Sequence, residues 1–549
     1  MYPTLTEYLD HWSERCPDTI WLRDLQGDDM TEWSWQAARE EIHAIGAWLE
    51  QHFASTGNNI GILSRNRAHW IVADLGAIAS GNVTIPMFTT LAQDTARYVI
   101  EFSDMQLLFV GETENWDAVA EVLPADIQLV CLPGVEIEQP HLRLQDLIET
   151  YRGQSPGNVC QAEDLITIVF TSGTTGVPKG VMQTHESFVL PIDRFLQAFA
   201  IREHGRYLSY LPLSHIAERQ LIEGSSLMTG GVVNFNESLL TLLRDLTTTR
   251  PHFMFGAPRV WEQLQQVIIG QFGSQEDLDA ALDADKAAVG QQVREMLGLD
   301  EADYLLTAAA PTPPALIHWY EEFGLVLMEG FGQTEAMGLI ANSHEARKIG
   351  SIGRPIEGVE IRLSDEDELQ VRAGGCATGY YKNPEKTAET FVDGWVYTGD
   401  KAQIDEDGFV YITGRVKDYF KTIQGKFVAP PPIEGAFSDN PHTEQLCLLG
   451  RGYSKTVMVC VLSDLAQQRD RDTVAEELRE MAHKVNATLD KHERIGALVI
   501  SCEPWNIENA LLTPTLKMRR EQIEQVFGER AQALAHKAAV QGELLVEWH

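Results

Sequence analysis

Short apolar runs that alternate with helical patterns limit how this chain can fold more than any other feature. An apolar run at residues 60–63 is followed by a helical pattern at 70–79 and by a second apolar run at 83–86. The same order returns at residues 207–211, 216–227 and 232–235. Strand–helix–strand units of this kind predict parallel sheets covered by helices, with ligands beyond the carboxyl ends of the strands.

The pattern changes at about residue 415. Strands are predicted at residues 446–449 and 457–462, followed by a helix whose start is indicated by Thr473 with Glu476 as a capping box. A chain of 549 residues is also too long for a single core. We therefore predict an α/β domain of mostly parallel sheets with a small β-region at residues 1–414. A small, mobile α+β domain is predicted at residues 415–549.

The charge balance excludes some classes of partner. Lys and Arg total 43 against 80 Asp and Glu, which gives a formal net charge of −37. Nucleic acid is therefore not expected as a partner, and the acidic surface gives no electrostatic attraction to anionic membranes. A site for an anionic substrate must instead gather its few cations locally.

The expected location of the protein in the cell follows from its targeting, membrane-spanning and cysteine patterns. Residues 1–10 lack a secretion-signal pattern, and no uncharged apolar stretch is long enough to cross a bilayer. The seven cysteines are dispersed without metal-ligand spacing, which favours reduced thiols. We expect a cytoplasmic protein, with at most peripheral contact at the inner membrane face.

A loop rich in glycine and hydroxyl groups follows the apolar run at residues 165–170. It reads Thr-Ser-Gly-Thr-Thr-Gly-Val-Pro-Lys-Gly from Thr171 to Gly180. Glycines allow backbone N–H groups to approach a phosphate, and Lys179 supplies a positive charge. The loop departs from the Walker pattern, and Val181 and Met182 indicate a second strand. The sequence favours a phosphate loop carried by a hairpin over a flexible surface loop.

Several other residues are ambiguous when each is taken alone. Asp400 suits ribose hydroxyls but is also a common turn residue, and Arg415 could be a surface ion-pair partner. Lys517 could simply be solvated, and His215 could be a satisfied core histidine. Glu335 could bind Mg²⁺ or be an acid in the first turn of a helix. Their joint occurrence, in this order along the chain, favours function.

Together these motifs identify a resemblance. The chain is similar to the acyl-adenylate-forming superfamily, the AMP-binding ligases, and within it to long-chain fatty acyl-CoA synthetases, from about residue 30 to residue 520. The motifs that carry the resemblance lie at residues 171–180, 210–218, 257–262, 425–430 and 512–517. The resemblance implies activation of a medium- or long-chain fatty acid by Mg·ATP to acyl-AMP and pyrophosphate. CoA would then form the thioester and release AMP.

The resemblance also implies roles for individual residues. The predicted catalytic residues are Lys517, Thr334, Glu335 and His215, and the predicted metal ligands are Glu335 and Thr171. The predicted phosphate-binding residues are Thr171, Ser172, Gly173, Thr174, Thr175, Gly176 and Lys179. Glu329, Gly330 and Phe331 would frame the adenine, and Ala309 with its neighbours Ala308 and Ala310 would form the wall near the acyl carbonyl. Asp400 would accept hydrogen bonds from the ribose hydroxyls with Arg415 beside it, Lys417 would be the domain hinge, and Gly425 would leave room for CoA.

Other functions remain open at this point. The acid could be aromatic or cyclic, or the acyl group could be loaded onto a carrier protein in place of CoA. A nucleotide-binding regulatory protein without catalysis is a remote alternative, because both Lys179 and Lys517 are present. The expected ligands are a fatty acid, ATP, Mg²⁺ and CoA, and the expected assembly is a monomer or a homodimer. The sequence does not define the acyl-chain length.

Overall fold

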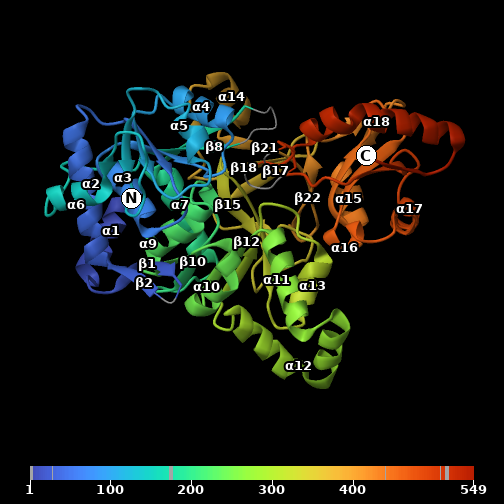
Figure 1. The fold of residues 1–549 in the computed structure, drawn as a ribbon, viewed down its shortest axis with the longest axis horizontal. Coiled ribbons are helices and arrows are strands. Elements are labelled where there is room, and N and C mark those ends of the chain that lie inside the picture. Colours follow the sequence, from blue (N-terminus) through green and yellow to red (C-terminus); the bar gives the residue numbers. More distant parts are fainter. Residues whose placement is uncertain (1–3, 28, 172–176, 439, 507–508, 514–517) are drawn as a thin grey trace. The chain divides into compact units, whose positions relative to one another are not determined.

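A computed structural model describes residues 4–27, 29–171, 177–438, 440–506, 509–513 and 518–549 (Figure 1). The chain divides into two compact units, which are described separately. The first comprises Met1–Ile361, Gln370–Tyr397 and Glu406–Phe409, and the second Arg362–Leu369, Thr398–Asp405 and Val410–His549. The domain boundary at residue 415 stays a prediction.

One large sheet of the first unit is parallel at its centre and antiparallel at its edges. Strands β1, β11, β10, β12, β13 and β14 pair in parallel, whereas β2, β15 and β16 are antiparallel additions. In spatial order the described strands are β16 (Arg354–Pro355), β15 (Ala336–Ala341), β14 (Leu327–Gln333), β13 (Tyr304–Thr307), β12 (Phe253–Gly256), β10 (Arg206–Ser209), β11 (Val232–Phe235), β1 (Ile20–Gln26) and β2 (Asp29–Ser34).

A second large sheet contains the predicted phosphate hairpin. Its strands are parallel except for β9 and β19, which extend one edge as antiparallel strands. In spatial order the described strands are β19 (Gly379–Tyr380), β9 (Lys179–Thr184), β8 (Leu165–Thr171), β4 (Val83–Met87), β3 (Asn59–Leu63), β5 (Leu107–Val110), β6 (Gln128–Cys131) and β7 (Leu142–Arg143).

A smaller sheet corresponds to the expected β-region. Its described strands are β17 (Glu360–Leu363), β18 (Glu368–Arg372), β21 (Trp395–Ile404), β20 (Phe391–Val392) and β22 (Val410–Arg415), the last of which pairs with β21.

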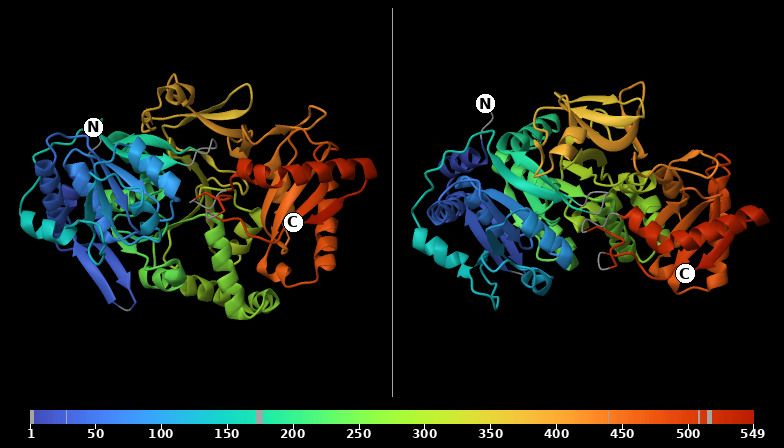
Figure 2. Two further views of the ribbon diagram at one scale, coloured as in Figure 1. Left: turned by 45° about the horizontal axis from the view of Figure 1, so that its top comes forward. Right: turned by 90° about the horizontal axis from the view of Figure 1, so that it is seen from above.

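Helices pack on the strands of the first unit. Helices α1, α3 and α6 each contact α2, beside the strands coloured blue (Figure 2). The described α-helices of this unit are α1 (Leu5–Arg15), α2 (Trp35–His52), α3 (Ala68–Ala79), α4 (Gln93–Phe102), α5 (Trp116–Ala120), α6 (Leu144–Tyr151), α7 (His185–Ala198), α8 (Ile216–Glu218), α9 (Ser225–Thr229), α10 (Leu242–Thr249), α11 (Pro258–Phe272), α12 (Gln275–Leu297), α13 (Pro314–Glu321) and α14 (Pro384–Thr390).

Helix α3 is buried on every side, so its polar residues need partners inside the protein. Asp74 is fully buried, and its Oδ2 lies 2.5 Å from Nη2 of the equally buried Arg219. Arg219 Nε lies 3.3 Å from Glu223, and its Nη1 donates to Thr167 Oγ1 at 2.8 Å. Burial is the main cause that raises the pKa of Glu223, with Asp74 the next largest. This buried ion cluster ties helix α3 to the segment after β10.

That segment differs from the single helix predicted at residues 216–227. It forms helix α8, then a π-helix, η1 (Arg219–Gly224), and then α9. Arg219 and Glu223 are the polar pair inside the π-helical turn, and both side chains are buried. The predicted helix was therefore correct in place, and it differs in type only at the π-helical turn Arg219–Gly224.

The second unit has the expected α+β organisation. Strand β26 pairs antiparallel with β25 and parallel with β27, which pairs with β28. Its remaining described elements are β23 (Phe420–Lys421), β24 (Phe427–Val428), α15 (Pro430–Ser438), β25 (Thr443–Leu449), β26 (Thr456–Leu462), α16 (Asp464–Gln467), α17 (Arg471–Asn486), β27 (Ile495–Ser501), α18 (Arg520–Gln541) and β28 (Leu545–Trp548).

One helix start in this unit was predicted wrongly. The Asp470 side chain caps α17 by accepting from Thr473 N at 3.0 Å, so Thr473 is the third residue of the helix and not its cap.

In the described part of the chain, no helix combines the length and apolar character that a membrane span requires. The expected fold class, α/β with parallel sheets and a separate α+β region, is confirmed.

Candidate functional site

The predicted phosphate loop joins two antiparallel strands. Thr171 ends β8 and pairs with Lys179, the first residue of β9, whose carbonyl accepts from Thr171 Oγ1 at 3.5 Å. A Cβ atom at Gly180 would lie 2.6 Å from Ile168 Cγ2, so a larger residue there would have to displace the Ile168 side chain. The predicted hairpin is confirmed. Its tip, residues 172–176, lies outside the described residues.

Strand β14 carries the residues predicted to surround the adenine. Glu329 is buried, and its Oε2 accepts from Gly350 N at 2.9 Å. Burial raises the pKa of Glu329 to about 7, against the opposing effect of that hydrogen bond. Phe331 pairs with Ile340 of β15, and Gly330 precedes it in β14. The Glu329 carboxyl therefore fixes the Gly350 turn in this structure.

The turn after β14 is connected to the phosphate hairpin by hydrogen bonds. The Thr334 carbonyl accepts from Gln183 Nε2 of β9 at 2.6 Å. The carbonyl of the next residue, Glu335, accepts from Ala377 N at 2.9 Å. Both predicted catalytic residues of this turn are thus held close to the hairpin.

Tyr380 connects the two motifs through its side chain. Its hydroxyl donates to Glu335 Oε1 at 2.6 Å, and Lys179 Nζ lies 5.4 Å from the centre of its ring. Sequence reasoning missed this tyrosine. Its partners become visible only once β19 is known to pair with β9, which is about 200 residues away in the chain.

His215 lies beyond the carboxyl end of β10. Its Nδ1 accepts from Ala217 N at 3.1 Å, so the side chain caps the short helix α8. Glu218 of the same helix is buried, and its Oε1 accepts from Ser209 Oγ at 2.8 Å and from Tyr210 N at 3.0 Å. Burial raises the pKa of Glu218 to about 8. Glu218 thus ties the helix behind His215 to the strand, a role that the sequence did not reveal.

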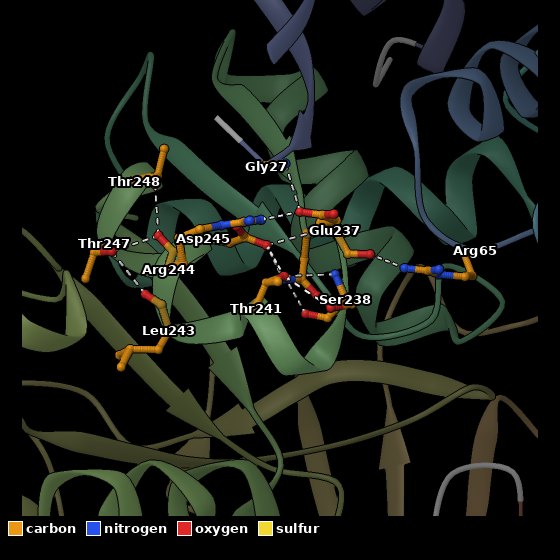
Figure 3. Close-up of polar contacts among 11 residues, drawn as sticks. Gly27, Arg65, Glu237, Ser238, Thr241, Leu243, Arg244, Asp245, Thr247 and Thr248 are labelled. Atoms are coloured by element: carbon orange, nitrogen blue, oxygen red, sulfur yellow. Dashed lines mark hydrogen bonds and ion pairs between the residues drawn. The ribbon is translucent and has the colours of Figure 1, made fainter. Parts of the chain in front are cut away.

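The loop after β3 joins the loops that follow β10 and β11. Arg65 donates to the Glu237 carbonyl, and Glu237 also accepts from Gly27 N and from Arg244 (Figure 3). The neighbouring Asn66 donates to the Leu211 carbonyl at 2.6 Å. Both large sheets are therefore connected at their carboxyl ends.

Ala309 follows β13 and has a φ of 73°, in the left-handed region. Few residues other than glycine adopt this conformation without strain, and strained positions concentrate at functional sites. The neighbouring Ala308 and Ala310 complete the segment predicted to face the acyl carbonyl, at the carboxyl end of a central parallel strand.

Asp400 and Arg415 belong to the second unit, and the structure brings them together. They are directly paired on β21 and β22, and Arg415 Nε lies 2.9 Å from Asp400 Oδ1. Asp400 is buried, and its backbone N donates to Thr398 Oγ1 at 3.1 Å. The carboxylate is therefore oriented by a neighbouring guanidinium, in the same place where it was predicted to meet ribose hydroxyls.

Lys417 is exposed, and its carbonyl accepts from Arg451 Nη2 at 3.4 Å. Gly425 lies in the turn between β23 and β24 with a φ of 74°, a conformation that favours glycine. Described atoms leave the space around its Cβ position open to 4 Å. The hinge and CoA roles of these two residues stay predictions.

Lys517 lies outside the described residues, but the residues that flank the segment 514–517 do not. Leu512 and Met518 form an isolated β-bridge, and Arg519 N donates to the Leu511 carbonyl at 2.9 Å. Arg520, the first residue of α18, makes two hydrogen bonds to Glu434 of α15, at 2.7 and 2.9 Å. The segment after Lys517 is thereby anchored to the second unit.

The described residues at the site fit a magnesium ion in donor type. Mg²⁺ binds oxygen and is commonly held by one or two carboxylates together with substrate phosphates. Glu335 offers a carboxylate next to the phosphate hairpin, and the hydroxyl of Thr171 is a further oxygen donor.

Comparisons with known proteins identify a family and several relatives that this chain resembles. The AMP-binding enzyme family matches residues 9–381, and the AMP-binding enzyme C-terminal domain matches residues 417–538. A long-chain-fatty-acid–CoA ligase of Mycobacterium bovis is 28% identical over 580 residues, covering 95% of both chains. The peroxisomal long chain acyl-CoA synthetase 7 of Arabidopsis thaliana is 28% identical over 604 residues, covering 96% of this chain and 85% of the relative.

A solved structure has the same fold. The adenylation domain of a carboxylate reductase from Mycobacterium chelonae superposes with a TM-score of 0.80 at 21% identity, covering 97% of this chain and 91% of that one. The family match extends over most of the chain and includes the hairpin, the Glu335 turn and the Tyr380 strand. With its site residues arranged on this fold, the chain belongs to the AMP-binding enzyme family.

Proposed function

We propose that the protein activates medium- or long-chain fatty acids as CoA thioesters in two steps. A carboxylate oxygen of the acid attacks the α-phosphorus of ATP, and the bond to the β-phosphate breaks to give acyl-AMP and pyrophosphate. The sulfur of CoA then attacks the acyl carbon. The bond to AMP breaks, AMP leaves, and the thiol proton is released.

The observation that carries this proposal is the convergence of three distant segments. Lys179, Glu335 and Tyr380 meet through a hydrogen bond of 2.6 Å and a cation–ring distance of 5.4 Å. A cation and a carboxylate at the end of a glycine-rich hairpin suit the phosphates of Mg·ATP. The fatty acid as substrate is supported by relatives named long-chain-fatty-acid–CoA ligases.

The first step must overcome repulsion between an anionic acid and a polyanionic phosphate. Lys179 would compensate charge on the β- and γ-phosphates, and Thr334 would donate to the α-phosphate. Glu335, with Thr171, would hold magnesium, which withdraws charge from the phosphate oxygens. In a protein with a net charge of −37, these local cations are what makes the site attractive to ATP.

The second unit would supply the remaining groups. Asp400 would accept hydrogen bonds from the ribose hydroxyls, oriented by Arg415. We propose that Lys517 bridges the acid and the α-phosphate during adenylation. A domain boundary at about residue 415, with its hinge at Lys417, would let the unit rotate afterwards and bring Gly425 to the path of CoA.

The test measures products from a graded panel of acids. Purified protein with Mg·ATP, CoA and saturated acids of increasing length is expected to form AMP and acyl-CoA in equal amounts, with the highest rates for medium and long chains. Aromatic acids and a phosphopantetheine carrier protein, each assayed in parallel, address the alternative substrates. Absence of AMP with every acid would refute the proposal, and a higher rate with aromatic acids would refute the fatty acid as substrate.

A further inference from the structure

We infer that Tyr380 is a positioning residue that couples the lysine of the phosphate hairpin to the carboxylate of Glu335, so that ATP phosphates and magnesium bind as one unit. This inference rests on the proposed function, because it concerns the same nucleotide site. It adds a residue to that site and assigns separate tasks to the ring and to the hydroxyl of its side chain.

The backbone holds Tyr380 in a defined place. Strand β19 pairs with β9 through Tyr380 and Val181, and Tyr381 N donates to the Gly180 carbonyl at 2.8 Å. Tyr380 N donates to Thr387 Oγ1 of α14 at 2.9 Å. Only 5% of the residue is exposed, so packing also fixes the ring. Tyr380 therefore moves together with the strand that begins at Lys179.

The hydroxyl acts on Glu335. A hydrogen bond of 2.6 Å to a carboxylate oxygen is short and charge-assisted, which makes it stronger than a neutral one. It fixes rotation of the carboxylate, while the Glu335 carbonyl is held separately by Ala377 N. Groups that orient a metal ligand in this way commonly change metal affinity by about 10- to 100-fold when they are removed.

The ring acts on Lys179. The ammonium lies 5.4 Å from the ring centre, within the range in which a cation is attracted to the aromatic face. Phe391 packs edge-on against the same ring at 5.8 Å, which limits its rotation. Because ring and hydroxyl contact different groups, one substitution can remove the hydroxyl contact and leave the ring contact in place.

The experiment measures ATP binding by titration calorimetry without any acid, so no turnover occurs. Each protein is titrated with ATP in excess Mg²⁺ and with ATP in EDTA. In Tyr380→Phe, we expect affinity in Mg²⁺ to fall about tenfold and affinity in EDTA to stay within twofold of wild type. In Tyr380→Leu, affinity in EDTA should also fall, by about two- to fivefold, because the ring contact with Lys179 is lost.

The neighbouring tyrosine provides a matched control. The Tyr381 hydroxyl accepts from Asn59 Nδ2 at 3.2 Å and has no contact with Glu335 among the described hydrogen bonds. Tyr381→Phe should leave both affinities unchanged. The inference is overturned if Tyr380→Phe lowers the ATP affinity equally in Mg²⁺ and in EDTA, or if it lowers the affinity in neither. If wild type itself binds no ATP in either condition, the proposed function falls as well.

Discussion

The stability of the first unit should depend on pH through Glu218. Its carboxyl is buried and accepts hydrogen bonds from Ser209 and Tyr210, yet desolvation outweighs them and raises the pKa to about 8. Within the described residues, no partner reaches Oε2. The protonated acid is thus the favoured form in the folded protein at neutral pH.

The sign and size of the effect follow from linkage. The folded pKa, about 8, lies above the ordinary value of 4.5, so the folded state binds more protons between these two values. The contribution to stability is fully present below pH 4.5 and is lost as pH rises through 8. At about 1.36 kcal/mol per pKa unit, the total is at most about 5 kcal/mol.

Glu218→Gln replaces the carboxyl with a neutral group of the same shape. The variant should unfold in urea with nearly wild-type free energy at pH 5 and should be more stable than wild type by several kcal/mol at pH 9. The exposed Glu203, changed to Gln, controls for removal of a carboxylate. The difference in the free energy of unfolding between Glu218→Gln and wild type must grow with pH. A difference that is equal at pH 5 and pH 9 would refute a buried, protonated Glu218.

Three further experiments test other features. Arg219→Met should lower the free energy of unfolding by about 3–5 kcal/mol, because the buried Asp74 loses its cationic partner; a loss below about 1 kcal/mol in urea titrations contradicts this. Arg520→Met should destabilise the second unit, and adding Glu434→Met should restore stability; a double variant no more stable than the single one contradicts a stabilising role for this largely buried pair. Lys517→Ala should abolish pyrophosphate release but keep acyl-CoA formation from supplied acyl-AMP, and loss of both reactions would contradict a role limited to adenylation.

The strand–helix–strand units were predictable because their signal is local. The predicted strand at 60–63, helix at 70–79 and strand at 83–86 correspond to β3, α3 and β4. The phosphate hairpin was predictable for the same reason, since its glycines and its following strand are adjacent in the chain. In both cases neighbouring residues carry all the information that the prediction needs.

Two of the three differences arose where distant residues decide the structure, and the third arose from a local choice between two capping residues. The π-helix contains Arg219, whose partner Asp74 lies about 145 residues earlier, and helical periodicity gives no sign of that pair. The start of α17 was placed too late because Asp470 and Thr473 are both good capping residues, and the chain uses the earlier one. Tyr380 was overlooked because its contacts depend on strand pairing.

The link between the loops after β3, β10 and β11 has a mechanical consequence. Arg65 and Asn66 belong to the loop of one sheet and donate hydrogen bonds to the loops of the other. Sliding of one sheet along the other would break these bonds together, so the two sheets form one stiff framework. If the protein activates acids as proposed, adjustment to acids of different length would come from side chains and connecting segments, and variants altered only there should accept new substrates without losing this framework.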